Sequence, residues 1–374
     1  MEEYIVKDHK KLRYGFTTGS CAAAATKAAM IMLFAQNKIE KVSLMTPKGL
    51  ELNLKVVDAS IQKNCAACAI QKDSGDDPDV TNGILVYAHV TKIQEKEIVI
   101  DGGIGVGRVT KIGLEQPIGE AAINRVPRKM IQNTVEEILE EQEYPFGIKV
   151  IISIPEGIEI AKKTFNPKLG IEGGISVLGT SGIVEPMSED AIKQTIHLEI
   201  KMVKASGKNY LLTTPGNYGE EFTKNILKLS LDKSVKCSNY VGDMIDYAVE
   251  ERIEGILLVG HIGKLVKLAG GIMNTHSKNG DARMEILTAY VAIAGGNGKL
   301  LHMIMNAITT EEALSYIKEA GLLAQTMELI MERIAYHLNK RACGCLKIGV
   351  ITFSNQLGLV GQTKEVEELL WYIL

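Results

Sequence analysis

The hydrophobic pattern of the first half of the chain combines alternating and helical periodicities. An alanine- and methionine-rich run over residues 21–34 follows a cluster of cap-forming residues at 17–20, which predicts a helix. A second helix is predicted to begin with proline at its first turn, near 127, and to end near 141. Strands are predicted over 41–46 and 50–57, joined by a turn at 47–49, and over 66–71, 84–93, 97–100 and 147–154. Hairpins with two helices indicate an α+β domain.

The second half of the chain alternates predicted strands with predicted helices. The strands fall at 210–213, 234–237, 256–259 and 347–353. The helices fall at 188–205, from 220, at 243–252, 264–269 and 281–294, and at 310–339 with a break at Gly321. This alternation predicts a Rossmann-like α/β domain with a mainly parallel, doubly wound sheet.

A segment rich in glycine and proline joins the two patterns. Residues 156–186 have weak periodicity, and we interpret them as a structured, functional connector. We therefore expect an α+β domain over 1–186, which ends in this connector, and a Rossmann-like α/β domain over 187–374.

Composition narrows the class of protein. The 374 residues are 46% hydrophobic and 23% charged, which is typical of a globular chain, and the net charge of −3 cannot hold a polyanion. We therefore expect no nucleic-acid partner, and any anionic ligand needs a local basic site. Two acids follow Met1, and the longest apolar runs are far shorter than the roughly 20 residues of a membrane span. These features predict a cytoplasmic protein without a membrane partner, whose six cysteines are reduced.

The segment 98–107 resembles the nucleotide loop of Rossmann-type enzymes, because a strand ending in Asp is followed by Gly103, Gly105 and Gly107. A cofactor loop also requires a helix next, whereas residues 108–113 are β-like. We favour a flexible glycine-rich loop beside a ligand over a Rossmann loop.

An acidic turn at 72–79 includes Asp76, Asp77 and Asp79 but lacks the spacing of a calcium loop. It could bind magnesium, accept ribose hydroxyls or attract a sulfonium cation. An ordinary solvated turn is the favoured interpretation.

A tight turn at 260–263 ends a predicted strand and opens a helix that carries Lys264 and Lys267. Such strand ends bind carboxylates in open α/β sheets, although two solvated lysines are an equal alternative. His276 lies in a further polar turn, where a structural histidine is favoured over a catalytic one. Two cysteine pairs, Cys65 with Cys68 and Cys343 with Cys345, could form a metal site, but free thiols are favoured and no metal is expected.

Nine segments in order along the chain resemble the cobalt-precorrin-5B C(1)-methyltransferase family of anaerobic cobalamin biosynthesis. They are LRYGFTTGSC (12–21), KDSGDDPDVT (72–81), GIGVGRVTKIG (103–113), AINRVPR (122–128), KTFNPKLG (163–170), GGISVLGTSGIV (173–184), TPGNYG (214–219), CSN (237–239) and the segment 260–277. One residue departs from the family pattern, since Arg125 stands where the family has proline. This difference affects only the geometry of the local turn.

The resemblance implies methyl transfer from S-adenosylmethionine to C-1 of cobalt-precorrin-5B, giving cobalt-precorrin-6A, with cobalt present only as part of the substrate. The acceptor is an anionic tetrapyrrole fringed with carboxylates, which suits local cations and helix N-termini. Transfer from an activated sulfonium is an in-line displacement that needs positioning and exclusion of water rather than a covalent nucleophile.

Roles for individual residues are expectations that follow from this resemblance. Donor binding is expected at Asp76, Asp77 and Asp79, or at Gly103, Gly105 and Gly107. Substrate carboxylates are expected at Thr17, Thr18, Ser20, Arg128, His261, Lys264, Lys267 and His276. A general base, the oligomeric state and the role of the cysteine pairs are left open.

Two other functions are compatible with the residues. A nicotinamide-dependent tetrapyrrole reductase would use the Gly103 loop, and NADPH rather than S-adenosylhomocysteine would then protect it from heat. A non-catalytic corrinoid or metal carrier would bind its ligand stoichiometrically without turnover and would use the paired cysteines as ligands.

Overall fold

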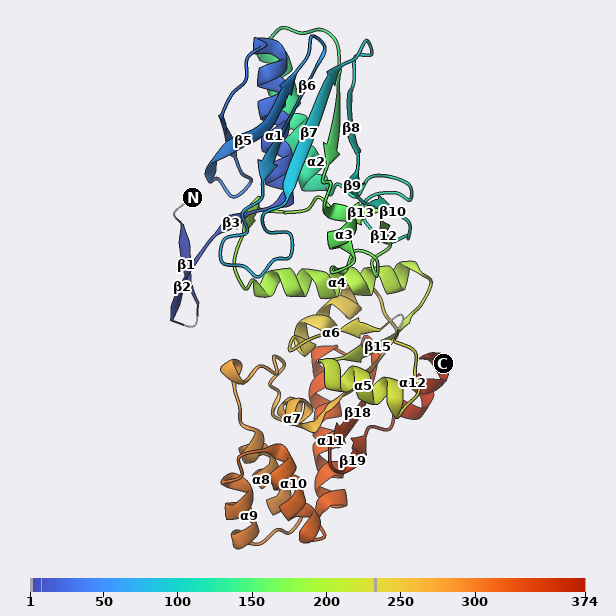
Figure 1. Ribbon diagram of the computed structural model, residues 1–374. Helices are drawn as coiled ribbons and strands as arrows, with labels where there is room; N and C mark the ends of the chain where they lie inside the picture. Colours follow the sequence, from blue (N-terminus) through green and yellow to red (C-terminus); the bar gives the residue numbers. More distant parts are fainter. Residues whose placement is uncertain (1–2, 8, 232–233, 374) are drawn as a thin grey trace. The chain divides into compact units, whose positions relative to one another are not determined.

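The computed structural model describes residues 3–7, 9–231 and 234–373 and divides the chain into two compact units (Figure 1). Unit 1 spans Met1–Ser188 and unit 2 spans Glu189–Leu374, so the boundary lies two residues beyond the expected one. Met1 and Glu2, on which part of the expectation of a cytoplasmic chain rests, lie outside the described residues. The expected mixture of α and β structure with a mainly parallel sheet is confirmed.

Unit 1 is built on a six-stranded sheet in the order β4-β5-β6-β7-β11-β8. Its neighbours are antiparallel except for β11 and β8, which are parallel. The strands are β4 (Lys41–Met45), β5 (Glu51–Ile61), β6 (Cys65–Gln71), β7 (Leu85–Lys92), β8 (Ile98–Gly102) and β11 (Ile148–Ser153). The predicted hairpin and strands are therefore confirmed, and β5 extends beyond its prediction through a bulge between Val57 and Ser60.

Two helices, α1 (Thr18–Ala35) and α2 (Arg125–Glu141), cover one face of this sheet (Figure 1). Alternate strand residues point into the core beneath them, as in β7, where Val86, Ala88 and Val90 are buried. Because six of the buried residues of α1 are alanines, the helix can lie close to both α2 and the sheet.

Helix α1 is long and apolar enough to cross a membrane by length and composition. Within unit 1, however, 78% of it is buried. Its apolar composition is accounted for by its central place in the core.

The connector and the N-terminal segment add short paired elements to unit 1. The pairs are β1 (Tyr4–Lys7) with β2 (Lys10–Arg13), β3 (Gly15–Phe16) with β14 (Ile183–Val184), β9 (Gly105–Val106) with β13 (Gly174–Ile175), and β10 (Arg108–Val109) with β12 (Ile171–Glu172). The connector also contains a short helix, α3 (Gly157–Ala161). The sequence pattern did not indicate these elements, because strands of two to four residues and a helix of five residues are too short to show a periodicity.

Unit 2 contains a five-stranded sheet in the order β16-β15-β17-β18-β19. Four strands are parallel and β19 is antiparallel. The strands are β15 (Tyr210–Thr214), β16 (Val235–Lys236), β17 (Gly255–His261), β18 (Lys347–Ser354) and β19 (Gly358–Gln362). Numbered along the chain, this order is 2-1-3-4-5, one of the two common arrangements of doubly wound sheets.

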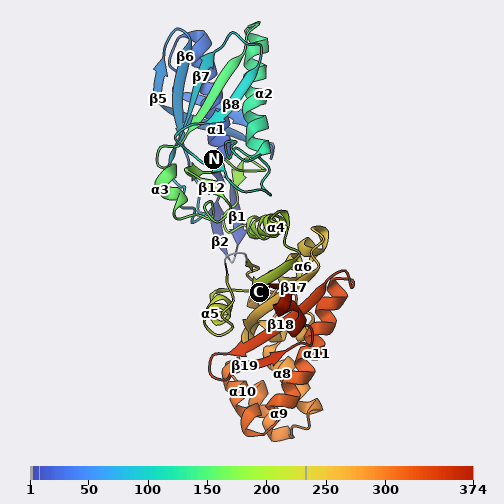
Figure 2. The ribbon, with the colours of Figure 1, turned by 90° about the vertical axis from the view of Figure 1, so that its right-hand side faces the viewer.

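Helices cover both faces of the unit 2 sheet, and Figure 2 shows α5 and α11 on opposite sides of it. One face packs against α5 (Asn217–Asn225) and α12 (Val366–Ile373). The other packs against the larger set: α4 (Glu189–Ala205), α6 (Val241–Glu250), α7 (Ile262–Leu265), η1 (Val266–Gly270), α8 (Arg283–Ile293), α9 (Gly298–Met305), α10 (Thr310–Glu319) and α11 (Leu323–Arg341). A short turn, η2 (Ser277–Asn279), precedes α8.

The predicted break at Gly321 is confirmed, since α10 ends at Glu319 and α11 begins at Leu323. The helix expected over 264–269 is instead one α-helical turn, α7, followed by a 3-10 turn, η1. Elements α9, β19 and α12 were not predicted.

Candidate ligand-binding site

The acidic turn of unit 1 is held by partners from the same unit. Asp79 Oδ2 accepts from the Lys72 ammonium at 2.5 Å, and its Oδ1 accepts from the Thr81 hydroxyl at 2.7 Å. Burial opposes ionisation, but Lys72 and Thr81 outweigh it and hold the pKa of Asp79 below its ordinary value. Asp76 Oδ2 accepts from the backbone N–H of Arg13 at 2.6 Å, and Asp77 Oδ1 accepts from the N–H of Met187 at 2.9 Å. Each carboxylate proposed for the donor thus already has an internal partner.

The glycines at 103, 105 and 107 allow close backbone packing. A Cβ on Gly105, whose φ is +74°, would lie 1.7 Å from the carbonyl oxygen of Ile154. The N–H of Gly103 donates to Ile152 O, and the N–H of Gly107 donates to Ile175 O. No helix follows, because β10 begins at Arg108. The loop therefore lacks the helix that a nucleotide loop requires, and at least two of its N–H groups are already used within unit 1.

The cluster Thr17, Thr18 and Ser20 closes the N-terminus of α1 against the connector. Thr17 caps the helix by accepting from the N–H of Ser20. The Thr18 hydroxyl and the Leu178 backbone are hydrogen-bonded in both directions, and the Ser20 hydroxyl donates to Gly182 O at 2.7 Å. These hydroxyls are buried, so the cluster has a structural role in this arrangement.

Arg128 has unused hydrogen-bonding capacity in unit 1. Its Nη1 donates to Ile100 O at 2.8 Å, whereas the buried Nε and Nη2 have no partner among the described residues. The nearby carboxylate of Asp101 is instead paired with Arg108, at 2.7 Å.

Arg125 begins α2, and Asn124 occupies the cap position, so the absence of the family's proline does not prevent the helix from starting.

In unit 2, the carboxyl ends of β15, β16 and β17 bring together several polar segments. We call this the sheet-end site and define it as residues 213–217, 237–239 and 260–264. Here the loop after β15 leads to α5 and the loop after β17 leads to α7. Since these connections leave on opposite faces of the sheet, β15 and β17 flank the topological switch point, where ligands of such folds bind.

Lys264 lies in the sheet-end site, as the sequence indicated. Its ammonium donates to Pro215 O at 2.7 Å, across the two loops. No carboxylate pairs with it in the described part of the chain. Burial, reinforced by the charges of Lys236 and Lys267, lowers the pKa of Lys264. A half-buried cation without a counterion favours an anionic ligand.

Both ring nitrogens of His261 are engaged. Nδ1 accepts from the N–H of Gly263 at 3.0 Å, and Nε2 lies 2.9 Å from Glu311. The Ser354 hydroxyl and the Asn355 N–H also donate to Glu311, and although burial opposes it, these bonds lower the pKa of the Glu311 carboxyl. His261 therefore orders the turn after β17.

The other two predicted residues of unit 2 lie further along the same segment. Lys267 is 3% exposed and donates to Thr275 O at 3.1 Å, and burial lowers the pKa of this ammonium. Exposed His276 accepts the N–H of Lys278 and caps η2. Lys267 therefore has a partner inside the protein, and His276 acts as the cap of a short turn.

The sequence argument gave no role to several residues of this edge. Thr213 and Thr214 end β15, and Thr352 lies near the end of β18; all three are fully buried, and their hydroxyls have no partner among the described residues. Ser238 adopts a left-handed conformation, with φ of 52°, in the loop after β16. The sequence feature that could have indicated these residues is the glycine-containing loop after β15, the first strand of the parallel sheet, because ligands of such folds bind at this position.

The two cysteine pairs do not behave alike. On β6, Cys68 faces the core and Cys65 faces the other side, so they cannot converge on one metal ion. Burial raises the pKa of Cys21, Cys68 and Cys237 to about 12, whereas Cys343 and Cys345 are exposed.

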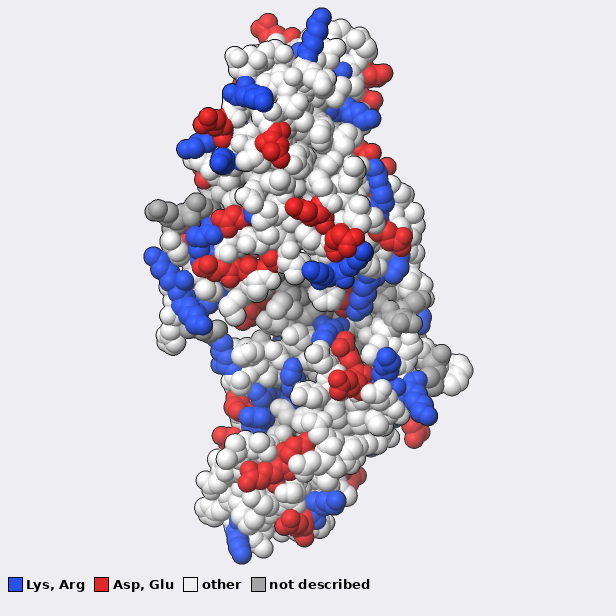
Figure 3. Space-filling view, viewed as in Figure 1, with Lys and Arg blue, Asp and Glu red and all other residues white. Residues whose placement is uncertain are grey.

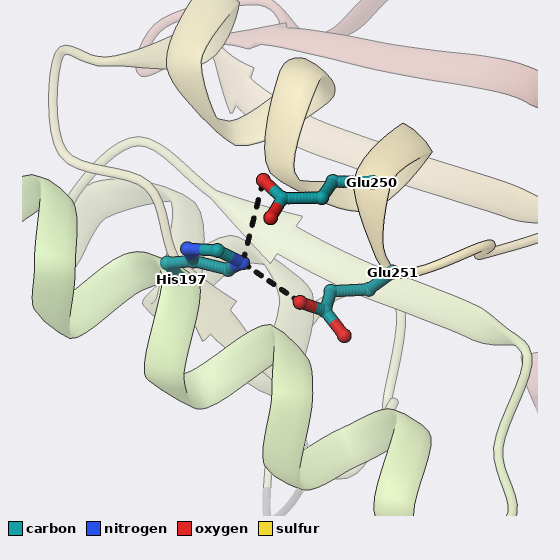
Figure 4. Close-up of side chains that lie close together, drawn as sticks. All are labelled: His197, Glu250 and Glu251. Carbon is teal, nitrogen blue, oxygen red and sulfur yellow. Dashed lines mark hydrogen bonds and ion pairs between the residues drawn. The ribbon is translucent and has the colours of Figure 1, made fainter.

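A histidine with two glutamates in unit 2 has the composition of a metal site (Figure 4). His197 Nε2 lies 2.8 Å from Glu251 and 3.8 Å from Glu250. Lys201 also approaches Glu251, at 3.5 Å, and the His197 ring stacks on Tyr247 at 4.3 Å. Since these contacts join α4 to α6 and already neutralise Glu251, we interpret the group as a tie between helices.

Charge on the surface is mixed. Figure 3 shows acidic and basic side chains interspersed over the face in view.

A doubly wound sheet with an unpaired cation at its switch point is typical of enzymes that bind small anionic or nucleotide-like ligands.

Comparisons with known proteins define the family. The CbiD family model matches residues 5–186, and the model of the CbiD C-terminal domain matches residues 274–364. The chain belongs to the CbiD family. Proteins named cobalt-precorrin-5B C(1)-methyltransferase from Ruminiclostridium cellulolyticum and Alkaliphilus metalliredigens are 53% and 46% identical to it. These matches cover 95% and 99% of this chain and 92% and 97% of the relatives. The solved structure of a cobalamin biosynthesis protein from Archaeoglobus fulgidus is 31% identical, with 71% of this chain and 83% of that chain covered and a TM-score of 0.40.

Proposed function

We propose that this chain transfers a methyl group from S-adenosylmethionine to C-1 of cobalt-precorrin-5B, giving cobalt-precorrin-6A in the cytoplasm. The observation that carries the proposal is the 53% identity, over 95% of the chain, to a protein named for this activity. Cobalt enters only as part of the tetrapyrrole.

The residues fit a reaction that depends on positioning. A bound sulfonium donor would supply an activated methyl group, so the chain has to hold two ligands at attack distance and exclude water. No covalent nucleophile is needed. The buried thiols of Cys21, Cys68 and Cys237 suit this picture, because a pKa of about 12 keeps them neutral.

Carboxylates of the macrocycle need cations with free donors. Among the residues expected to bind them, Arg128 and Lys264 lack acidic partners in the described residues. We assign a macrocycle carboxylate to Arg128, since a guanidinium with two unfilled donors gains charge-assisted hydrogen bonds from a carboxylate. We assign framework roles to Thr17, Thr18, Ser20, His261, Lys267 and His276, whose polar groups have internal partners.

The activity is tested with purified full-length protein, methyl-labelled S-adenosylmethionine and cobalt-precorrin-5B under anaerobic conditions. We expect label in the macrocycle and an equal amount of S-adenosylhomocysteine. Stoichiometric macrocycle binding without turnover would favour a carrier, and heat protection by NADPH but not by S-adenosylhomocysteine would favour a reductase.

The role of Arg128 is tested by Arg128→Met, with Arg125→Met as the matched control three residues earlier. We expect the first change to raise the macrocycle dissociation constant about 10- to 100-fold and the exposed control to have little effect. Equal affinities for both variants would remove Arg128 from the site.

A further inference from the structure

Among the described residues, the sheet-end site contains one cation, Lys264, whose charge no carboxylate of the protein balances. Lys236, at the end of β16, pairs with Glu220 at 3.1 Å, and Arg283 pairs with Asp281. Lys264 contacts only the neutral carbonyl of Pro215 within the described residues. The edge therefore offers a single unmatched positive charge, which suits a ligand with one carboxylate better than a ring with many.

The loop after β15 provides hydrogen-bond donors beside this cation. Gly216 precedes α5, a helix of nine residues, and no side chain in the described part of the chain caps its N-terminus. The first N–H groups of a helix have no acceptor within the helix, and its dipole favours negative charge there. A Cβ on Gly216 would lie 3.5 Å from Lys264 Nζ, so the ammonium and the open helix end lie side by side.

Unsatisfied hydroxyls add to the polar capacity of the same edge. Thr213, Thr214 and Thr352 are fully buried and have no hydrogen-bond partner among the described residues. A buried hydroxyl without a partner is costly, about 1–3 kcal/mol each. Of the four buried threonine hydroxyls without a partner among the described residues, Thr326 lies in α11, and the other three lie at or near the carboxyl ends of β15 and β18, so unmet polar capacity is concentrated at this end of the sheet.

We propose that the β15/β17 switch point binds the methyl donor and that Lys264 receives the donor's α-carboxylate, beside the open N-terminus of α5. This rests on the proposed function and gives the donor a site in unit 2. The candidates in unit 1 are less suitable, because the carboxylates of Asp76, Asp77 and Asp79 have internal partners and the glycine loop at 103–107 is packed against backbone.

The test compares two ligands by calorimetry on the full-length protein. S-Adenosylhomocysteine carries the α-carboxylate, and 5′-methylthioadenosine lacks the whole amino-acid group. We expect Lys264→Met to weaken S-adenosylhomocysteine about 10- to 100-fold and to leave methylthioadenosine within about twofold, because only the first ligand loses a charge-assisted bond. Lys347→Met is the matched control, since Lys347 lies at the opposite end of the sheet and is paired with Glu368.

Each result separates the inference from the proposed function. Wild-type affinity of Lys264→Met for S-adenosylhomocysteine, or equal losses for both ligands, would overturn the assignment of Lys264 while the methyltransferase proposal stands. Failure of the wild-type protein to bind S-adenosylhomocysteine would overturn both.

Hydrogen exchange of the wild-type protein keeps the inference testable if Lys264→Met does not fold. Added S-adenosylhomocysteine should slow exchange in peptides that cover 214–219 and 260–264. Protection confined to 72–81 or 103–107 would place the donor in unit 1 and refute the inference.

Discussion

Replacing Asp79 with asparagine tests whether the acidic turn of unit 1 is structural. Lys72 is 3% exposed, and its only carboxylate partner among the described residues is Asp79, at 2.5 Å. The change Asp79→Asn keeps the shape of the side chain and removes its charge, which leaves a buried ammonium without a counterion.

The expected cost follows from this geometry. Removing one partner of a buried ion pair costs about 3–5 kcal/mol. The Asp79 side chain is 25% exposed, so solvent moderates the loss, and we expect the lower end, about 3 kcal/mol. For a unit of this size that corresponds to a fall in Tm of roughly 6–12 °C.

The assay combines thermal unfolding of the full chain, followed by circular dichroism, with calorimetry of S-adenosylhomocysteine binding. Asp77→Asn is the matched control, because it makes the same change in the same turn and has a single backbone partner, the N–H of Met187. We expect Asp79→Asn to lower Tm and keep donor affinity, and the control to change Tm little. Unchanged Tm with lost donor affinity would refute the reasoning.

The effect should also depend on pH. The pKa of Asp79 is lowered in the folded protein, so its contribution is fully present above the unfolded pKa of about 3.9 and is lost as pH falls through the folded value. The stability difference between wild type and Asp79→Asn should therefore be constant near neutral pH and shrink below about pH 4.

Three further outcomes are expected. Gly105→Ala should lower the free energy of unfolding by about 3 kcal/mol, because its Cβ would meet Ile154, whereas Gly83→Ala, with open space at φ +84°, should cost about 1; equal Tm values for the two would contradict the packing argument. Glu311→Gln should cost about 1–2 kcal/mol in urea unfolding at neutral pH, and this loss should begin to shrink below the unfolded pKa of about 4.3 and fade as pH passes through the lower folded pKa of Glu311; a loss that does not depend on pH would contradict this account of the Glu311 carboxylate. In mass spectrometry after native alkylation, modification should appear at the accessible thiols and reach the buried ones only on unfolding; the accessible set is Cys65, Cys343 and Cys345.

Much of the fold could be predicted from the chain where the periodicity was strong. The alternation in β7 and the cap-plus-alanine run of α1 each gave the element and its buried face. Elements of two residues, such as β9 and β13, could not be found in this way, since they depend on backbone contact between Gly105 and Gly174 rather than on side-chain pattern.

The candidate site was predictable only in part. A lysine after a strand and a glycine turn indicated Lys264, because the position of strand ends follows from sheet topology. Which lysine lacks a counterion could not be predicted, since the partner of Lys72 and the acceptor for Lys267 depend on how distant turns fold. His261 and the acidic turn have suitable chemistry, yet internal hydrogen bonds occupy them.

Helix α1 is synthesised early, but the residues that pack against it are synthesised much later. Its N-terminus is closed by Leu178 and Gly182, about 160 residues further along the chain, and α2 covers it only after residue 125. During most of the translation of unit 1, this apolar segment of membrane-spanning length is therefore exposed, because the residues that will cover it have not yet been synthesised. Folding in the cell should accordingly depend on chaperones that hold this segment, and truncation of the chain before residue 182 should yield aggregates rather than a smaller folded domain.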